Sequence, residues 1–186
     1  MTRRATLLPG MPSRKVKRLR VVGIRGGTHK AFLQAGTVVV PCAIGRNGVT
    51  WHKREGDGRT PAGTFGLLDG YFRADRQQRV QSPALMRAIK RCDGWCDDPQ
   101  NGQYNRKVTL PFAASHEELS RKDRVYDIIV VMDHNQNPRI KGLGSAIFFH
   151  LANSSLGGTA GCVAIDLPAM RRLLPRLGRH CRMNIG

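Results

Sequence analysis

A cysteine and a histidine near the end of the chain have the types and spacing for nucleophilic chemistry. Cys162 follows a glycine in "GGTAGCVAID", and His150 ends the apolar run "AIFFH". A thiol attacks a carbonyl as the thiolate, and a neighbouring imidazole can take its proton and lower its effective pKa from about 8.5. The imidazole can later return that proton to a leaving amine. The pair predicts acyl transfer through Cys162, unless Cys162 is an inert core residue and His150 an ordinary strand-end side chain.

Two short strands must hold these side chains close together. The runs "AIFFHLA" (146–152) and "CVAI" (162–165) read as strands joined by the loop "NSSLGGTAG". If they pair as an antiparallel hairpin, facing side chains at the loop end lie roughly 5 Å apart, within reach of thiol and imidazole. Gly161 allows a sharp turn there, and the N–H groups of Gly161 and Cys162 could point at a developing oxyanion.

The rest of the chain predicts a mainly β, sandwich-like domain with a C-terminal helix and a few short helices. Apolar, β-branched runs at residues 19–25, 37–45, 64–75 and 125–135 read as strands, without regular helices between them. We expect short helices in "SPALMRAIKRC" (82–92) and from Ser115 in "SHEEL". In "DLPAMRRLLPRLG" (166–178), Asp166 suits the N-cap of a helix that Pro175 should end near Leu174.

The length of 186 residues favours one domain, which we expect over residues 18–180. Residues 1–17 are basic and polar and predict a flexible N-terminal arm. That stretch has no apolar core of the length that a secretory signal peptide needs, so no export signal is visible in it. No run approaches the ~18 apolar residues of a membrane span.

The charge predicts attraction to polyanions. The chain has 31 Lys and Arg against 13 Asp and Glu, a net charge of +18, which suits nucleic acid, anionic lipid or an acidic cell-surface polymer. No nucleic-acid motif is present, so no specific nucleic acid is expected. The five cysteines leave at least one thiol free, and the sequence does not decide the pairing of Cys42, Cys92, Cys96 and Cys181. Cys92 and Cys96 lack a second close pair, which disfavours structural zinc.

Several motifs in order carry a resemblance to a known family. "HLANSSLGGTAGCVAI", with the upstream "GDGRTPAGTFGL", resembles the catalytic domain of L,D-transpeptidases, which has the YkuD-like fold, and the likeness spans roughly residues 18–177. "DGWCDDPQNGQYN", "SHEEL", "YDIIVV" and "GLGSAIFFH" resemble the branch found in many proteobacteria. The resemblance implies a β-sandwich-like fold with the active site at one end, a monomer, and a cell-envelope enzyme of peptidoglycan synthesis and cell shape without metal or cofactor.

The same resemblance implies a mechanism. The thiolate of Cys162 would attack the carbonyl at the L-centre of a diaminopimelate residue in a donor stem peptide, and a D-amino acid would leave. An amine on an acceptor stem would then resolve the thioester into a crosslink. His150 would be general base and acid, oriented by the backbone carbonyl of Leu151. The alternatives are an L,D-carboxypeptidase or crosslink hydrolase, in which water resolves the thioester, and a non-enzymatic basic module that binds nucleic acid or the sacculus.

The chain departs from the family motif Ser-His-Gly-Cys-Ile/Val-Arg at positions that recognise substrate. Ala160 replaces the histidine, and Ala164 replaces the arginine and cannot hold a carboxylate. Leu151 replaces the glycine that usually follows the catalytic histidine. Resemblance to the branch with this alanine implies a crosslink of 1–3 rather than 3–3 type.

Polar and aromatic side chains in the loops beside the motif strands are candidates for the substrate groove, with a lid at residues 93–105. They are Thr159, Ser145, Asn135, Trp95 and Tyr104.

Overall fold

The computed structural model describes residues 15–24, 28–78, 80–82, 84 and 86–186. Residues 1–14 of the expected N-terminal arm therefore lie outside the described residues. The first strand, β1 (Val16–Gly23), already begins within the expected arm, and the last, β14 (Leu177–Ile185), runs past residue 180.

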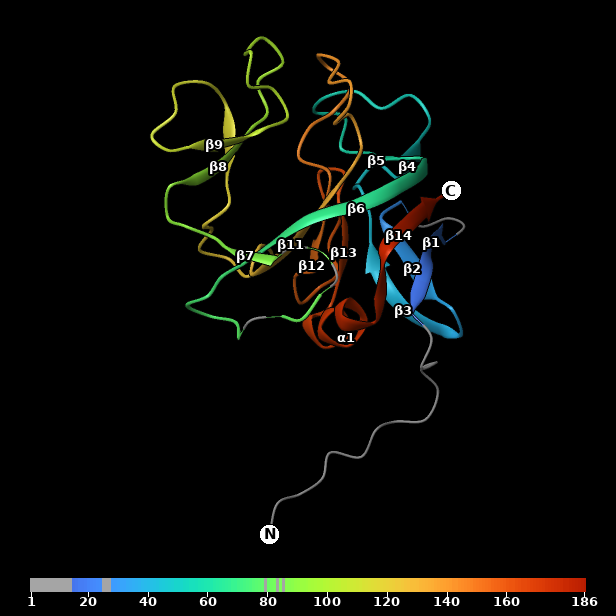
Figure 1. The fold of residues 1–186 in the computed structure, drawn as a ribbon. Helices are drawn as coiled ribbons and strands as arrows, with labels where there is room; N and C mark the ends of the chain where they lie inside the picture. Colours follow the sequence, from blue (N-terminus) through green and yellow to red (C-terminus); the bar gives the residue numbers. More distant parts are fainter. Residues whose placement is uncertain (1–14, 25–27, 79, 83, 85) are drawn as a thin grey trace.

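The strands of the largest sheet close into a ring (Figure 1). Their order is β11-β12-β13-β3-β2-β1-β14-β6-β7, and β11 also pairs with β6. The long strand β6 makes the closure, because its residues 63–66 pair with β14 while its residues 67–72 pair with β11. The expectation of a mainly β fold is confirmed. The other strands of this sheet are β2 (Lys30–Ala35), β3 (Val38–Ala43), β6 (Gly63–Phe72), β7 (Met86–Ala88), β11 (Ile128–Met132), β12 (Phe148–Leu151) and β13 (Val163–Ile165).

Two smaller sheets flank the ring. Strands β8 (Asp93–Cys96), β9 (Lys107–Thr109) and β10 (His116–Glu118) form an antiparallel sheet in the order β10-β8-β9. The short strands β4 (Val49–Thr50) and β5 (Thr60–Pro61) pair in parallel.

Strands β11 and β12 are buried on both faces, which explains why they are apolar throughout. Alternate side chains of a strand point to opposite faces. Val130 and Phe149 belong to the main core, whereas Ile129, Val131 and Phe148 belong to a second apolar cluster with aromatic residues of β8 and of the segment before β11. The second cluster also contains Cys162, so the face of β12 opposite the main core is the one that meets the candidate nucleophile.

The C-terminal helix follows the sequence prediction. Helix α1 (Leu167–Leu173) begins after Asp166, whose carboxylate accepts a hydrogen bond from the N–H of Ala169. The chain tightens into a 3₁₀ turn, η1 (Leu174–Arg176), at Pro175, because a proline cannot continue an α-helix hydrogen-bond pattern. The buried side chains of α1 seal one end of the main core.

Two of the expected short helices are wrong. The segment 82–92 contains β7, which pairs in parallel with β6, although residues 83 and 85 lie outside the described residues. The segment that begins at Ser115 forms β10, which pairs with β8. In both segments pairing with a neighbouring strand outweighs the local helix and capping signals, because such propensities are weak compared with tertiary contacts.

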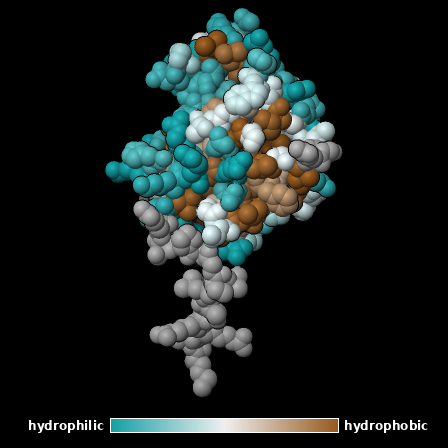
Figure 2. Space-filling view, turned by 90° about the vertical axis from the view of Figure 1, so that its right-hand side faces the viewer, coloured by the Kyte–Doolittle hydropathy of each residue, from teal (hydrophilic) through white to brown (hydrophobic). Residues whose placement is uncertain are grey.

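The outer face of β1, β2 and β3 carries exposed apolar side chains. Val22 and Phe32 are partners across β1 and β2, and both are exposed, as is Val39 of β3. Figure 2 shows an apolar area on the side of the molecule formed by these strands. None of these three residues lines the pocket described below.

Candidate active site

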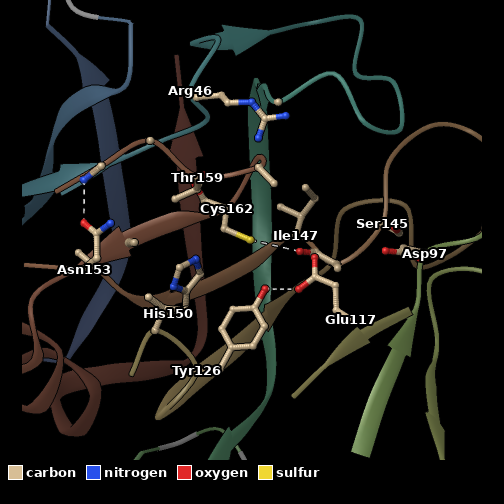
Figure 3. Close-up of a pocket in the computed structure, with 18 of the residues that line it drawn as sticks. Arg46, Asp97, Glu117, Tyr126, Ser145, Ile147, His150, Asn153, Thr159 and Cys162 are labelled. Atoms are coloured by element: carbon tan, nitrogen blue, oxygen red, sulfur yellow. Dashed lines mark hydrogen bonds between the residues drawn. The ribbon is translucent and has the colours of Figure 1, made fainter. Parts of the chain in front are cut away.

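A pocket of about 440 Å³ lies beside β12 and β13 and contains both Cys162 and His150 (Figure 3). Ser145 and Thr159, two of the residues predicted for the substrate groove, also line it. The thiol and the imidazole, chosen from the sequence for their chemistry, therefore share one cavity.

The two strands that carry the pair run in parallel, so the expected antiparallel hairpin is wrong. His150 pairs with Ala164, and Phe149 pairs with Val163. Cys162 lies two positions before Ala164, and side chains two positions apart point to the same face of a strand. Because Ala164 is the partner of His150, Cys162 and His150 share a face and are offset by two residues along it. For two parallel strands, the loop between them must return from the end of β12 to the level of its start. Near the end of this loop, Thr159 forms a β-bridge with Gly45, which follows β3.

The thiol of Cys162 is buried and held by the backbone of the preceding strand. Its Sγ donates to the carbonyl of Ala146 at 3.2 Å and accepts from the N–H of Phe148 at 3.3 Å. Burial, followed by the charge of Glu117, raises the pKa of the thiol to about 12. The group is consequently a neutral thiol rather than a thiolate in this structure.

The imidazole of His150 is oriented by a backbone carbonyl. Its Nδ1 lies 2.8 Å from the carbonyl oxygen of Leu151, and only a protonated nitrogen can donate to a carbonyl. This assigns the hydrogen to Nδ1 and leaves Nε2 as the proton acceptor. The ring of Tyr126 packs edge-on against it, with ring centroids 5.3 Å apart. Burial lowers the pKa of His150 to about 4, so the imidazole is neutral too.

The turn before Cys162 requires glycine. Gly161 has a φ of +147°, and a Cβ atom there would lie 2.8 Å from the carbonyl oxygen of Arg59. Its N–H donates to Oγ1 of Thr159 at 3.1 Å. Gly161 therefore supplies the expected sharp turn, while its N–H is engaged within the turn rather than directed at an oxyanion.

Two threonines fix the backbone of Cys162. Oγ1 of Thr159 donates to the carbonyl of Cys162 at 2.7 Å, and the buried Thr60 approaches the same oxygen at 3.4 Å. Thr60 belongs to the turn "GDGRTPAGTF", far upstream in the sequence. Through this contact the upstream turn supports the backbone of the Cys162 loop.

A comparison with protein-family models identifies the fold around this pocket. The model of the L,D-transpeptidase catalytic domain matches residues 20–185. The chain belongs to the L,D-transpeptidase catalytic domain family. No curated protein and no solved structure among those compared matches it. Family membership supports an L,D-transpeptidase-family function, in a family that acts on peptidoglycan. None of the helices in the described part of the chain is long and apolar enough to cross a membrane.

Three predicted groove residues lie behind the pocket wall of this L,D-transpeptidase domain. Trp95 is buried edge-on against Phe148, with ring centroids 5.1 Å apart. Tyr104 is buried and donates to Glu55 at 2.5 Å. Asn135 is bonded to the backbone of the loop before β12, including the carbonyl of Gly144 at 2.9 Å. These side chains shape the pocket without lining it.

A buried asparagine that the sequence reading missed links these groups. Oδ1 of Asn105 accepts from the indole N–H of Trp95 at 2.9 Å and from the N–H of Ala146 at 3.1 Å. Its amide donates to the carbonyl of Asn135 at 2.8 Å. Ala146 supplies the carbonyl that accepts the hydrogen bond of the Cys162 thiol, so Asn105 helps to position Cys162 through Ala146. Its only sequence signal was its place in the loop expected to form a lid.

The sequence reading also missed the acidic and phenolic side chains of the pocket. Glu55, Asp97, Glu117 and Tyr126 all line it. Glu117 was assigned to the start of a helix, whereas the strand β10 directs it into the pocket beside Tyr126, with which it is hydrogen-bonded. The pairing of β10 with β8 places Glu117 close to Asp97, which directly follows β8.

Proposed function

We propose that this chain is a peptidoglycan L,D-transpeptidase in which Cys162 is the nucleophile and His150 the general base and acid. The observation that carries the proposal is the shared pocket, in which both side chains stand on one face of β12–β13 and Leu151 fixes the imidazole with Nε2 as acceptor. The substrate is a stem peptide with diaminopimelate, and the enzyme acts in the cell envelope as a monomer. The product is a crosslink of 1–3 type.

The first half of the reaction forms a thioester. Nε2 of His150 takes the proton of the Cys162 thiol, and the sulfur attacks the L-centre carbonyl of the donor diaminopimelate. The carbon–sulfur bond forms and the carbon–nitrogen bond to the terminal D-amino acid breaks. The leaving amine takes the proton back from the imidazolium.

The second half transfers the acyl group. An acceptor amine attacks the thioester carbonyl and gives its proton to His150, and the thiolate of Cys162 leaves and is reprotonated. The product is an amide, so no atom changes its oxidation state and no redox cofactor is needed. If water replaces the amine, the same thioester yields an L,D-carboxypeptidase or a crosslink hydrolase.

The raised pKa of Cys162 and the lowered pKa of His150 constrain when the proton moves. Both shifts arise mainly from burial and both disfavour the charged pair in the empty pocket. We infer that the ion pair forms only when a bound donor supplies a carbonyl for the sulfur to attack. The N–H of Cys162 is the proposed oxyanion donor, joined by the N–H of Gly161 if substrate displaces its bond to Thr159.

Two of the candidate groove residues are proposed to touch the substrate. Thr159 and Ser145 line the pocket, whereas Asn135, Trp95 and Tyr104 are proposed to support its wall. Ala164 lies beside His150 and lines the pocket without a charge. The loss of a cation at this position is consistent with an acceptor or donor group other than the one that the family's usual arginine binds.

Intact-mass measurement with a tetrapeptide muropeptide tests the proposal. The wild-type chain should gain the mass of the donor less its terminal D-amino acid, and Cys162→Ala should gain none while retaining its folded circular dichroism spectrum. Cys92→Ala is the matched control, because Cys92 does not line the pocket. Addition of an acceptor stem should yield dimers, and hydrolysis alone would indicate the carboxypeptidase. Full turnover by Cys162→Ala would overturn the assignment.

A further inference from the structure

Four carboxylates line the active-site pocket; Asp123 is paired with Arg121, and the other three are Glu55, Asp97 and Glu117. They come from the loop before β5, the loop after β8 and strand β10. Figure 3 shows Asp97 and Glu117 on one side of Cys162 and His150 on the other. Glu55, Asp97 and Glu117 are referred to below as the acidic arm.

Only neutral groups bond two of these carboxylates. Oε2 of Glu55 accepts hydrogen bonds from the hydroxyls of Tyr104 at 2.5 Å and Ser145 at 2.7 Å. Glu117 accepts a hydrogen bond from the hydroxyl of Tyr126. Among the described residues, no Lys, Arg or His forms an ion pair with any member of the acidic arm.

The third carboxylate has an unsatisfied acceptor. Oδ1 of Asp97 is buried and has no hydrogen-bond partner among the described residues. Burial of a carboxylate oxygen without a donor is costly, and proteins satisfy nearly all such atoms. Burial raises the pKa of Glu117, the hydrogen bond from Tyr126 and the charge of Arg121 oppose that rise, and the charges of Asp97 and Glu55 add to it. The three carboxylates are therefore close enough to repel one another. Although the charge of Arg121 reaches Glu117, the acidic arm has no ion-pair partner among the described residues, and Oδ1 of Asp97 has no hydrogen-bond donor.

The cations of the pocket do not meet this need. Lys53 is bonded to Asp57 at 2.5 Å, and Arg121 is paired with Asp123 at 2.7 Å. Arg46 lies on a different side of the pocket from Asp97 in Figure 3. No group of three His, Cys, Asp or Glu in the described part of the chain is arranged to hold a metal ion. The missing donor is therefore best supplied by the substrate.

We propose that the acidic arm binds an ammonium group of the stem-peptide substrate, with Oδ1 of Asp97 accepting a hydrogen bond from it. The proposal rests on the function proposed above, in which the substrate contains diaminopimelate, a diamine. An ammonium satisfies both the charge of the arm and the unpartnered oxygen. It can belong to the donor's diaminopimelate or to the acceptor. Ala164, which offers no positive charge for a carboxylate, agrees with a pocket that selects for an amine.

Chemical variants of enzyme and substrate together test the proposal. The enzyme variants are Asp97→Asn and Glu117→Gln, which remove charge and keep shape. The matched control is Glu118→Gln, since Glu118 neighbours Glu117 in β10 but is exposed and does not line the pocket. The donors are a tetrapeptide muropeptide with its diaminopimelate side-chain amine free and the same peptide with that amine acetylated. Thermal unfolding checks that each variant is folded, and the two arm variants are scored separately.

The first readout is the rate of thioester formation on Cys162, followed by intact mass. If the ammonium belongs to the donor, wild type and Glu118→Gln should acylate the free-amine donor about tenfold faster than the acetylated one. Asp97→Asn should lose most of this preference, because its rate of thioester formation should fall with the free-amine donor and stay unchanged with the acetylated donor.

The second readout is the decay of the thioester formed from the acetylated donor. If the ammonium belongs to the acceptor, Asp97→Asn should slow transfer to an acceptor stem about tenfold and leave transfer to hydroxylamine, uncharged at neutral pH, unchanged. The inference is overturned if both arm variants match wild type in donor preference and in transfer. Failure of the proposed function looks different, because wild-type Cys162 would then form no thioester at all.

Discussion

At the scale of residues, burial decides the protonation state of the candidate catalytic pair. Cys162 is 5% exposed and His150 is 6% exposed, and a buried group prefers its neutral form. A thiol and an imidazole could also rest as an ion pair, as the sequence analysis allowed. The apolar surroundings of this pair favour the neutral forms until substrate binds.

The first prediction concerns thiol reactivity. Because the pKa of Cys162 is raised to about 12, only about 1 in 10⁴ of its molecules should be thiolate at pH 8. Iodoacetamide should therefore label Cys162 more slowly than Cys92, which is the only one of the five cysteines that is not buried. Peptide mapping after timed alkylation measures both sites. Faster labelling of Cys162 than of Cys92 would show a resting thiolate and contradict the prediction.

The second prediction concerns acid stability. Burial lowers the pKa of His150 from 6.5 to about 4. At a pH between these two values, His150 therefore binds a proton in the unfolded chain but not in the folded chain. Stability should consequently fall as the pH decreases from about 7 to about 4, by up to about 3 kcal/mol from this residue. Urea unfolding at pH 7 and pH 4.5 measures the slope.

The control for that slope is His150→Gln, which has no titrating group at this position. It should lose less stability on acidification than wild type does. His134, whose pKa burial also lowers, is present in both proteins and cancels in the comparison. Equal losses in the two proteins would exclude His150 as a source of the acid sensitivity.

At the scale of elements, the site is assembled from segments that hold one another. The parallel pair β12–β13 sets the face and the offset of Cys162 and His150. Thr60 of β5 supports the turn before Cys162 from one side. Asn105, after β8, supports the loop before β12 from the other side. The small β8–β9–β10 sheet therefore helps to position Cys162 as well as supplying acidic residues.

The third prediction tests this support through Asn105→Ala. The change leaves Trp95 and Ala146 without their buried acceptor, and Asn105 has a φ of +54°, which alanine adopts less readily. We expect a loss of about 2–4 kcal/mol in the free energy of unfolding. Urea unfolding measures it, with the exposed Gln103→Ala as control. A loss no larger than that of the control would mean that the network does not hold the loop.

At the scale of the whole molecule, charge is distributed unevenly. The chain has a net charge of +18, yet one side of its pocket is acidic. Cationic side chains line a groove between β1 and β14 on the outside of the ring, and the described part of that groove has no carboxylate. Its charged residues are Lys17, Arg18, Arg20 and Arg182, with His180 beside them. The basic exterior would attract a polymer that is rich in carboxylates, whereas the acidic arm of the pocket would bind an amine of that polymer.

The fourth prediction follows from the basic exterior. Binding of the inactive Cys162→Ala chain to purified sacculi should weaken by about tenfold or more between 50 and 500 mM NaCl, because salt screens exposed charges. Arg18→Gln with Arg182→Gln should reduce both the affinity at low salt and its salt dependence. Co-sedimentation measures the bound fraction. Binding that is independent of salt would exclude charge as the main source of attraction.

Much of the fold and part of the site could be predicted without coordinates. The strands of apolar residues at β11, β12 and β13 and the capped helix α1 were visible because their signals are local. The helices expected near β7 and β10 were wrong, since those short segments take their conformation from the strands that they pair with. Glu117, one of the three residues of the acidic arm, lies in β10 rather than in the expected helix for the same reason.

The sequence by itself determined the family of this protein and its candidate catalytic residues: a cysteine after an obligatory glycine, a histidine at a strand end, and the motifs of the L,D-transpeptidase family. These are properties of residue type and short spacing. Only the tertiary structure decided that β12 and β13 run in parallel, that the pair rests uncharged, and that Glu55, Asp97 and Glu117 meet beside Cys162. Strand direction, burial and the meeting of distant carboxylates depend on contacts between segments far apart in the chain, which local pattern does not encode.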